Sequence, residues 1–534
     1  MKTIARLVPL MFLATTAMAC ASETEDPAAV GADEEDITSL TARARKLTFA
    51  GYVYVEEGTS DPQIVSTVKR QTQSAFGALR EANVGVNSRE FKDVDPGTFL
   101  KSPVSVVDPA NPSASPKKMT KVSYTFTDDA VVPVPMARRT SIPLGLLNAN
   151  YSGQSQRILR ECTNGDQHAQ EFVGSIWYVF DPSLPNCKTA MKAEQTKIDA
   201  DRRGLAQGQI PKSELDRLYI PMTARLKATT TQTTGKFPEY DRLYAGGVEP
   251  GKLVIGMVSG MMADWAAGER HEVYEDDGYG MWYGGIREIF KAHAGFKITS
   301  AEGVQDPLSY KVGTQTVKFA NFEEMISFEL DRRAPASAPS VNRNELRKAI
   351  ALTLVKKFVT FEAPATVKIG GVEKPLTIKL QTYFGAETDA TPHKRAIKTS
   401  DIFVYNGHSY IGYGPLDPSR FTAADFPSSY QVLMINGCVS YNYYEKDYLP
   451  LKPGGTQNLD LVTNGLESWV NESGESMGRF VGAFIDGKIN NYEAILKASQ
   501  FTYYGYDWGM DALRVVDGEA DNKFTPSRTP ITLR

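Results

Sequence analysis

Two residues that could act together as nucleophile and base follow two hydrophobic segments of this 534-residue chain. His408 ends the segment DIFVYNGH, and Cys438 ends the later segment YQVLMINGC. An imidazole can take the proton of a neighbouring thiol, and the thiolate attacks carbonyl carbon. Gly407 and Gly437 precede the two residues and would let a substrate approach the backbone closely. These residues therefore suggest covalent catalysis by a thiol, provided that the two segments form neighbouring strands.

Three other functional motifs match the sequence less well than this pair of residues does. Ser409 is a poor nucleophile for an α/β-hydrolase, because the Gly-x-Ser-x-Gly spacing is missing and no histidine follows His408. GGVEPGKL, residues 246–253, lacks the Ser or Thr with which a phosphate-binding loop holds magnesium. RHEVYEDD, residues 270–277, lacks the second histidine of a zinc helix, and its acidic trio could hold calcium but favours a solvated turn. We therefore expect no metal and no cofactor.

The segments that end in His408 and Cys438 belong to a repeating pattern. Over residues 238–534, apolar runs alternate with amphipathic helices, and the runs are almost continuously hydrophobic. This pattern predicts an α/β domain with a mainly parallel sheet that is covered on both faces. Chemistry in such sheets lies at the carboxyl ends of the strands, which is where both residues are expected.

A hydrophobic strand ending in His, then a second one ending in a small residue and Cys, resembles the caspase–gingipain–legumain class of cysteine peptidases. The resemblance covers about residues 370–500 and implies a caspase-like sandwich with Cys438 as nucleophile and His408 as general base. It also implies that the backbone amides of Ser409 and Cys438, with Gly437 beside them, hold the oxyanion. The class usually has Gly after the histidine, so Ser409 is a departure that affects this oxyanion site.

Further residues near the candidate nucleophile have two interpretations. Tyr441, Tyr443 and Tyr444 could line a substrate cleft, or they could pack under the sheet. One charged residue commonly sets primary specificity in the resembled class, and the candidates are Asp417, Asp425, Asp447 and Asp460.

An α+β accessory domain is expected over residues 46–237. Asp61 and Pro62 favour the start of a helix that runs towards Asn83, and the surrounding β-branched and aromatic runs predict strands. Cys162 and Cys187 are expected to form a disulfide around a strand, SIWYVF, in an oxidising compartment. No catalytic cluster is recognisable in this part, which indicates a structural or binding role.

The N-terminus has the layout of an export signal. Residues 1–20 place Lys2 and Arg6 before an apolar run that is too short to span a bilayer stably. The ending AMAC resembles a lipoprotein signal, which implies a lipid on Cys20 and attachment to the cell envelope. Ordinary cleavage after Ala-Met-Ala would instead release a periplasmic or secreted protein. Residues 21–45 begin with an acidic stretch and are expected to be a solvated tether.

Composition and charge limit the kinds of partner that the protein is expected to bind. The chain is 42% hydrophobic and 23% charged, which is ordinary for a globular protein, and its formal net charge of -4 argues against a nucleic-acid partner. We expect a peptide or protein substrate and contact with a membrane only through the lipid anchor. The leading hypothesis is an exported cysteine peptidase, and resolution of the thioester by an amine would make it an acyl transferase. The alternative is a non-enzymatic envelope protein that uses a caspase-like scaffold to bind a protein or glycan.

Overall fold

The computed structural model of the chain describes residues 37–91, 94–229, 233–261, 273–330, 340–469, 473–501 and 512–534. The expected signal peptide and its Cys20 lie outside the described residues, as does most of the expected tether. Residues 37–45, the end of that tether, are not solvated, because Ile37 and Ala42 are fully buried and Thr38 pairs with Val516. Residues Glu35–Arg534 form one compact unit.

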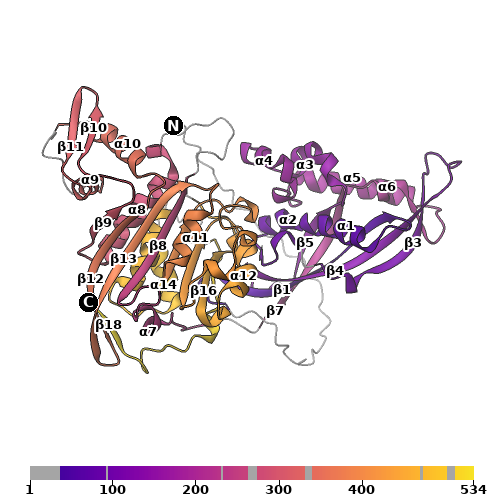
Figure 1. Cartoon of the computed structure of the whole chain (residues 1–534). Coiled ribbons are helices and arrows are strands. Elements are labelled where there is room, and N and C mark those ends of the chain that lie inside the picture. The colour runs from indigo at the N-terminus through magenta and orange to yellow at the C-terminus, as the bar shows by residue number, and fades with distance from the viewer. Residues whose placement is uncertain are drawn as a thin grey trace, which may run out of the picture. The chain divides into compact units, whose positions relative to one another are not determined.

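The chain builds two large sheets in a mixed α/β fold (Figure 1). The first has the order β5-β7-β1-β4-β3-β6, with β2 also paired to β4. Its pairs are antiparallel except for β3 with β6. The bounds are β1 (Ala42–Glu56), β2 (Gly85–Val86), β3 (Leu100–Val107), β4 (Lys117–Pro133), β5 (Ser141–Leu147), β6 (Gln209–Pro211) and β7 (Tyr219–Ala228).

Helices accompany the first sheet because its strands alternate in burial. Phe49, Val53 and Val55 of β1 are buried, whereas Tyr52 and Tyr54 between them are only half-buried. These buried side chains of β1 pack in the same hydrophobic core as the apolar side chains of α1 and α2. The helices are α1 (Asp61–Gln73), α2 (Ala75–Glu81), α3 (Ser155–Cys162), α4 (Gln167–Glu171), α5 (Pro185–Asp201) and α6 (Lys212–Leu215).

The structure refines the expected helix over residues 61–83. Its N-cap is Ser60 rather than Asp61, and Ser60 forms a capping box with Gln63. The helix is interrupted at Ser74, whose hydroxyl donates to the Gln71 carbonyl and accepts the amide of Leu147 in β5. Two helices, α1 and α2, therefore replace one.

The predicted disulfide between Cys162 and Cys187 is confirmed, and it joins α3 to α5. The strand predicted inside its loop is wrong. Val173–Tyr178 forms a 3₁₀ helix, which packs Trp177 and Tyr178 against Phe76 of α2. A short apolar run has no periodicity that separates a strand from a buried helical turn, so packing decided its form.

The second sheet has the order β17-β16-β15-β14-β8-β13-β12-β18, with β9 also paired to β12. Neighbours among β13, β8, β14, β15 and β16 are parallel, whereas β12 and β17 flank them in the antiparallel sense. The bounds are β8 (Lys252–Met261), β9 (Lys297–Ala301), β12 (Val359–Ile369), β13 (Val372–Ala386), β14 (Ile402–Asn406), β15 (Gln431–Asn436), β16 (Leu459–Asn464), β17 (Arg514–Asp517) and β18 (Ile531–Leu533).

Both faces of the second sheet are covered, as the near-continuous apolar strands predict. Val404 and Met434 join a core with α8 (Asp277–Ala292), α13 (Ser473–Ile485) and α14 (Tyr492–Ser499). Their neighbours Tyr405 and Ile435 join the opposite core with α11 (Thr391–Lys398) and α12 (Ser440–Leu451). The other helices are α7 (Tyr240–Leu243), α9 (Phe322–Glu329) and α10 (Arg343–Leu354), and β10 (Leu308–Val312) pairs with β11 (Gln315–Phe319).

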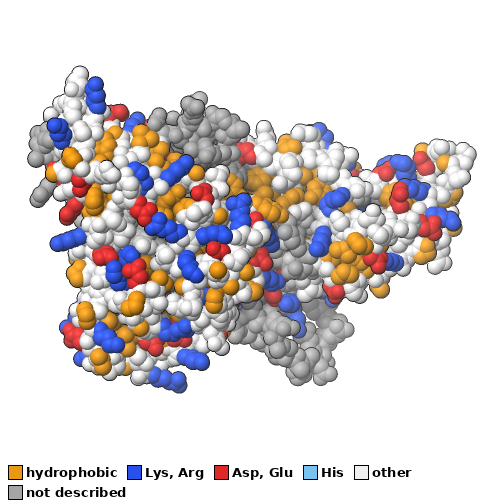
Figure 2. All heavy atoms as spheres, viewed as in Figure 1, with side chains coloured by type: hydrophobic (Ala, Val, Ile, Leu, Met, Phe, Trp, Pro, Cys, Tyr) orange, Lys and Arg blue, Asp and Glu red, His pale blue; other side chains and the backbone are white. Residues whose placement is uncertain are grey.

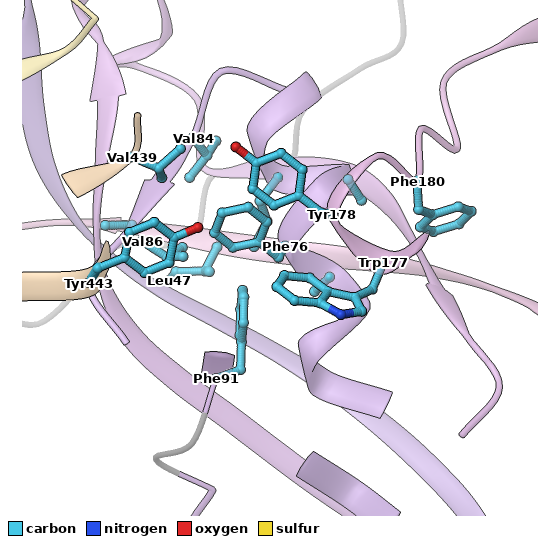
Figure 3. Close-up of a cluster of buried hydrophobic side chains, with 14 of the residues drawn as sticks. Leu47, Phe76, Val84, Val86, Phe91, Trp177, Tyr178, Phe180, Val439 and Tyr443 are labelled. Carbon is cyan, nitrogen blue, oxygen red and sulfur yellow. The ribbon is translucent and has the colours of Figure 1, made fainter. Parts of the chain in front are cut away.

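The two sheets share the core that contains α12. Figure 3 shows Val439 and Tyr443 of this region beside Phe76 and Tyr178 from the first part of the chain. The Asn442 amide of α12 also donates to the backbone carbonyls of Val86, which ends β2, and of Ser88, at 3.1 and 2.7 Å. The helix that follows Cys438 is therefore held by residues more than 300 positions earlier.

Candidate functional site

β14 and β15 are parallel neighbours, with Asn406 opposite Asn436 in the register. His408 and Cys438 each follow two residues after these paired asparagines. The two chain positions that the sequence singled out therefore leave the same edge of the sheet, where α/β proteins commonly place their chemistry.

A sharp turn presents Cys438 at this edge. After β15 the chain passes through Gly437 and Cys438 to Val439, whose φ of +52° is unusual for a β-branched residue, and α12 begins at Ser440. The Val439 amide donates to Leu466 at 2.9 Å, and the Ser440 hydroxyl donates to Ile435 at 2.8 Å. Bonds of this kind help to offset a strain of about 1–3 kcal/mol at such a turn. Cys438 itself is a free cysteine and, as a whole residue, is partly buried.

Glu387 holds the backbone at His408. Its Oε1 accepts the His408 amide at 2.8 Å and the Tyr405 hydroxyl at 2.8 Å, and the same hydroxyl lies 2.9 Å from the His408 carbonyl. The carboxyl fits here because a Cβ at Gly260 or Gly407 would come within 1.8 or 2.0 Å of Oε1. Burial raises the pKa of Glu387 to about 7, although hydrogen bonds from tyrosine and the His408 amide lower it.

The thiol of Cys438 faces the loop that follows β16. Its hydrogen bond goes to the Ser468 carbonyl at 3.4 Å, and among the described residues none joins it to His408. Burial, and then the charge of Glu467, raise the pKa of this thiol to about 11. Glu467 is held by Arg80 of α2 at 2.5 Å and by the Tyr178 hydroxyl at 3.1 Å.

The imidazole of His408 is neutral at pH 7, because burial lowers its pKa to about 4. A raised thiol pKa and a lowered imidazole pKa are the reverse of what a thiolate–imidazolium pair produces. The resting site therefore holds a neutral thiol and a neutral base.

The backbone of the expected oxyanion site lies between the two turns. Within the described residues, the amides of Ser409 and Cys438 donate no hydrogen bond to a protein acceptor. Ser409 packs so closely on Gly437 that a Cβ at residue 437 would come 2.3 Å from its hydroxyl. A side chain at residue 437 would therefore have to displace the hydroxyl of the serine that departs from the resembled class.

The three tyrosines after Cys438 pack inside the protein. The exposed fractions of Tyr441, Tyr443 and Tyr444 are 0%, 2% and 1%, so all three are almost completely buried, although Tyr443 also contributes to the wall of a cavity beside Arg89. Tyr443 lies against Phe76, and the Tyr444 hydroxyl donates to the Ser409 carbonyl at 3.3 Å. Of the two interpretations of these tyrosines, packing under the sheet is the one that agrees with their burial.

Three of the four candidate specificity aspartates, Asp417, Asp425 and Asp460, are engaged in internal bonds, and the fourth, Asp447, also has an interaction within the protein. Asp417 is buried and pairs with Arg89 at 3.0 Å. Asp460 is fully buried and accepts a hydrogen bond from Asn522 at 2.6 Å, together with bonds from two tyrosines. Asp425 lies 3.2 Å from Lys394. The bonds of Asp417 and Asp460 make them part of the framework rather than free carboxylates in a cleft.

Sequence reasoning missed a polar ladder beneath the candidate site. Asn436 donates to Asn406 at 3.1 Å, and Asn464 donates to Asn436 at 2.8 Å. Arg514 of β17 donates to both Asn464 and Asn436 at 3.0 Å. A signal was present, because three hydrophobic strands each end in asparagine, in VYN, MIN and VTN. The ladder fixes the strand ends from which Gly437 and Cys438 emerge.

The described residues contain no group of three or more His, Cys, Asp or Glu side chains that could hold a metal ion. In the same part of the chain, no helix combines the length and the apolar character needed to cross a membrane. Comparisons with protein-family models, with curated proteins and with solved structures found no match.

Proposed function

We propose that the second sheet carries a cysteine peptidase of the caspase–gingipain–legumain type, with Cys438 as nucleophile and His408 as general base. The observation that carries this proposal is the register of β14 and β15, which brings both residues to one sheet edge. The amides of Ser409 and Cys438, which donate to no protein acceptor in the described part of the chain, add to it, because an oxyanion needs donors that are not already engaged.

The electrostatics favour a mechanism that starts from neutral groups. Binding of a peptide would draw the Cys438 thiol from the Ser468 carbonyl towards His408. The imidazole takes the thiol proton as sulfur attacks the scissile carbonyl, and the two amides hold the oxyanion. The imidazolium then gives its proton to the departing amine, which leaves a thioester on Cys438. Water attacks the thioester with His408 again as base and releases the acid.

One observation favours the second candidate, a non-enzymatic protein that binds a protein or glycan. The thiol is hydrogen-bonded to Ser468 rather than to His408, and its pKa is raised to about 11, chiefly by burial. A permanently neutral thiol would make the residue a packing element. The two candidate functions can be distinguished with a peptide that carries an electrophile. A peptidase would react with it at Cys438 with the help of His408, whereas a binding protein would not.

The test is labelling of the full chain with peptides that carry a thiol-reactive ketone, with the modified residue identified by mass spectrometry. We expect a constant rate between pH 8 and 5 and a fall near pH 4, where His408 becomes protonated. Iodoacetamide requires the thiolate, so its rate should keep rising towards pH 11.

Three variants make the test specific. His408→Gln should slow peptidyl labelling by roughly 100- to 10,000-fold, the usual contribution of a general base. Cys438→Ser should remove the label, and His293→Gln, near the end of α8, is the matched control that should change nothing. Equal rates for His408→Gln and the unaltered chain would favour the binding protein instead.

A further inference from the structure

A polar cavity in the first part of the chain is separate from the candidate peptidase site. Its volume is about 440 Å³, within the range of small-molecule sites, which is roughly 300–1,000 Å³. β1, β3, β4, β6 and α5 contribute to its wall, and Figure 2 shows blue and red side chains mixed over the region that Figure 1 labels α6 and β3. The aromatic and charged side chains that line it are Tyr52, Tyr54, Lys121, Arg202, Glu214 and Arg217.

The cavity is cationic although the chain is acidic. Lys121, Arg202 and Arg217 bring three positive charges against the single negative charge of Glu214, a balance of 3 - 1 = +2. The formal net charge of the whole chain is -4. A positive concave surface on an acidic protein attracts anions to one place.

A buried carboxylate organises this cavity. Glu214 is only 3% exposed and accepts the Tyr52 hydroxyl at 2.6 Å. Its other oxygen lies 3.2 Å from Arg202 and 3.5 Å from Arg217. Arg217 is fixed further by its bond to the Tyr219 carbonyl at 2.9 Å. The cationic groups are thus held in position before a ligand arrives, which lowers the entropic cost of binding.

Among the three cationic side chains of the cavity, Lys121 is the one that does not bind Glu214 and so is available to a ligand. Its ammonium lies 4.5 Å from the centre of the Tyr52 ring, and within the described residues no carboxylate lies within ion-pair distance of it. Tyr54 is its partner across β1 and β4, and the rings of Tyr52 and Tyr54 meet edge to face at 5.5 Å. An ammonium over the Tyr52 ring, with the Tyr54 ring beside that ring, suits a ligand with both an acidic group and a ring-shaped body.

We propose that this cavity binds a small acidic sugar, whose carboxylate or phosphate contacts Lys121 and Arg202. The sugar ring lies against the tyrosine rings, and its hydroxyls bond to Gln195 and Gln209, which also line the wall. This function would belong to the first part of the chain and does not depend on the chemistry at Cys438.

The experiment is calorimetric titration of the full chain with glucuronate, glucose 6-phosphate, glucose and inorganic phosphate. We expect one or both acidic sugars to bind and glucose to bind at least tenfold more weakly. A preference between glucuronate and the sugar phosphate identifies the acidic group. Absence of binding by both acidic sugars, or equal binding of glucose, would overturn the proposal, and inorganic phosphate binding as tightly as the sugar phosphate would overturn its sugar component.

Lys121→Gln tests the site without disturbing the Glu214 network. We expect it to weaken binding of the acidic sugar roughly tenfold or more, as loss of a charge-assisted hydrogen bond does. Lys118→Gln, on the exposed beginning of β4, is the matched control and should bind as the unaltered chain does. Equal weakening by both variants would mean a diffuse charge effect and would refute a defined site.

Discussion

Replacement of Glu387 by Gln should stabilise the protein relative to the unaltered chain at high pH, and much less so at low pH. Glu387 is 4% exposed, and its pKa rises from an ordinary 4.5 to about 7, mainly because burial disfavours the charged form. A difference of this size corresponds to about 3 kcal/mol of unfolding free energy. The folded state holds the proton more tightly than the unfolded chain, so the penalty is absent below pH 4.5 and complete above pH 7. The amide cannot ionise, and its oxygen can still accept the bonds from Tyr405 and the His408 amide.

The assay is urea unfolding of both proteins at intervals from pH 4 to pH 8. The stability of Glu387→Gln relative to the unaltered chain should rise by about 3 kcal/mol across this range, because only the unaltered chain acquires a buried charge. Glu373→Gln, exposed near the start of β13, the strand that Glu387 directly follows, is the control and should show no such rise. The reasoning would be refuted if the stability difference between Glu387→Gln and the unaltered chain stayed constant to within about 1 kcal/mol from pH 4 to pH 8. The carboxyl would then not be desolvated in the folded protein.

Two further predictions concern the first part of the chain and its contact with the second. Replacing Cys162 and Cys187 together by Ala should cost about 3 kcal/mol in urea unfolding, because the bond closes a loop with a sequence separation of 25; an unchanged midpoint would contradict this. Arg89→Met should cost about 3–5 kcal/mol at pH 7, because it leaves Asp417 buried without its cation, and a loss under 1 kcal/mol would show that water replaces the arginine.

The elements of the second sheet could be predicted because their signals are local. β14 and β15 are nearly uninterrupted apolar runs that end in Asn, and the segments that end in His408 and Cys438 are indeed parallel neighbours. The pairing of Cys162 with Cys187 follows from their number and spacing in the same way.

The environment of the candidate site could not be predicted, because distant segments build it. The sequence around Glu387 has the composition of a turn, whereas in the fold Gly260 and Gly407 approach its carboxyl closely and leave the space in which it is buried. The direction of the thiol depends on Ser468 and on Arg80, which holds Glu467 from the first part of the chain. No local pattern contains this information, since it depends on tertiary packing.

Because both parts of the chain share the core around α12, neither part is a complete folding unit by itself. A fragment that began near residue 238 would expose Tyr443 and Val439, which now lie against Phe76 and its neighbours (Figure 3). It would also lack Arg80 and the backbone carbonyls that Asn442 of α12 uses as acceptors. The first part therefore acts as a built-in scaffold for the turn at Cys438. Recombination or proteolysis between the two parts would yield incomplete pieces rather than two interchangeable modules.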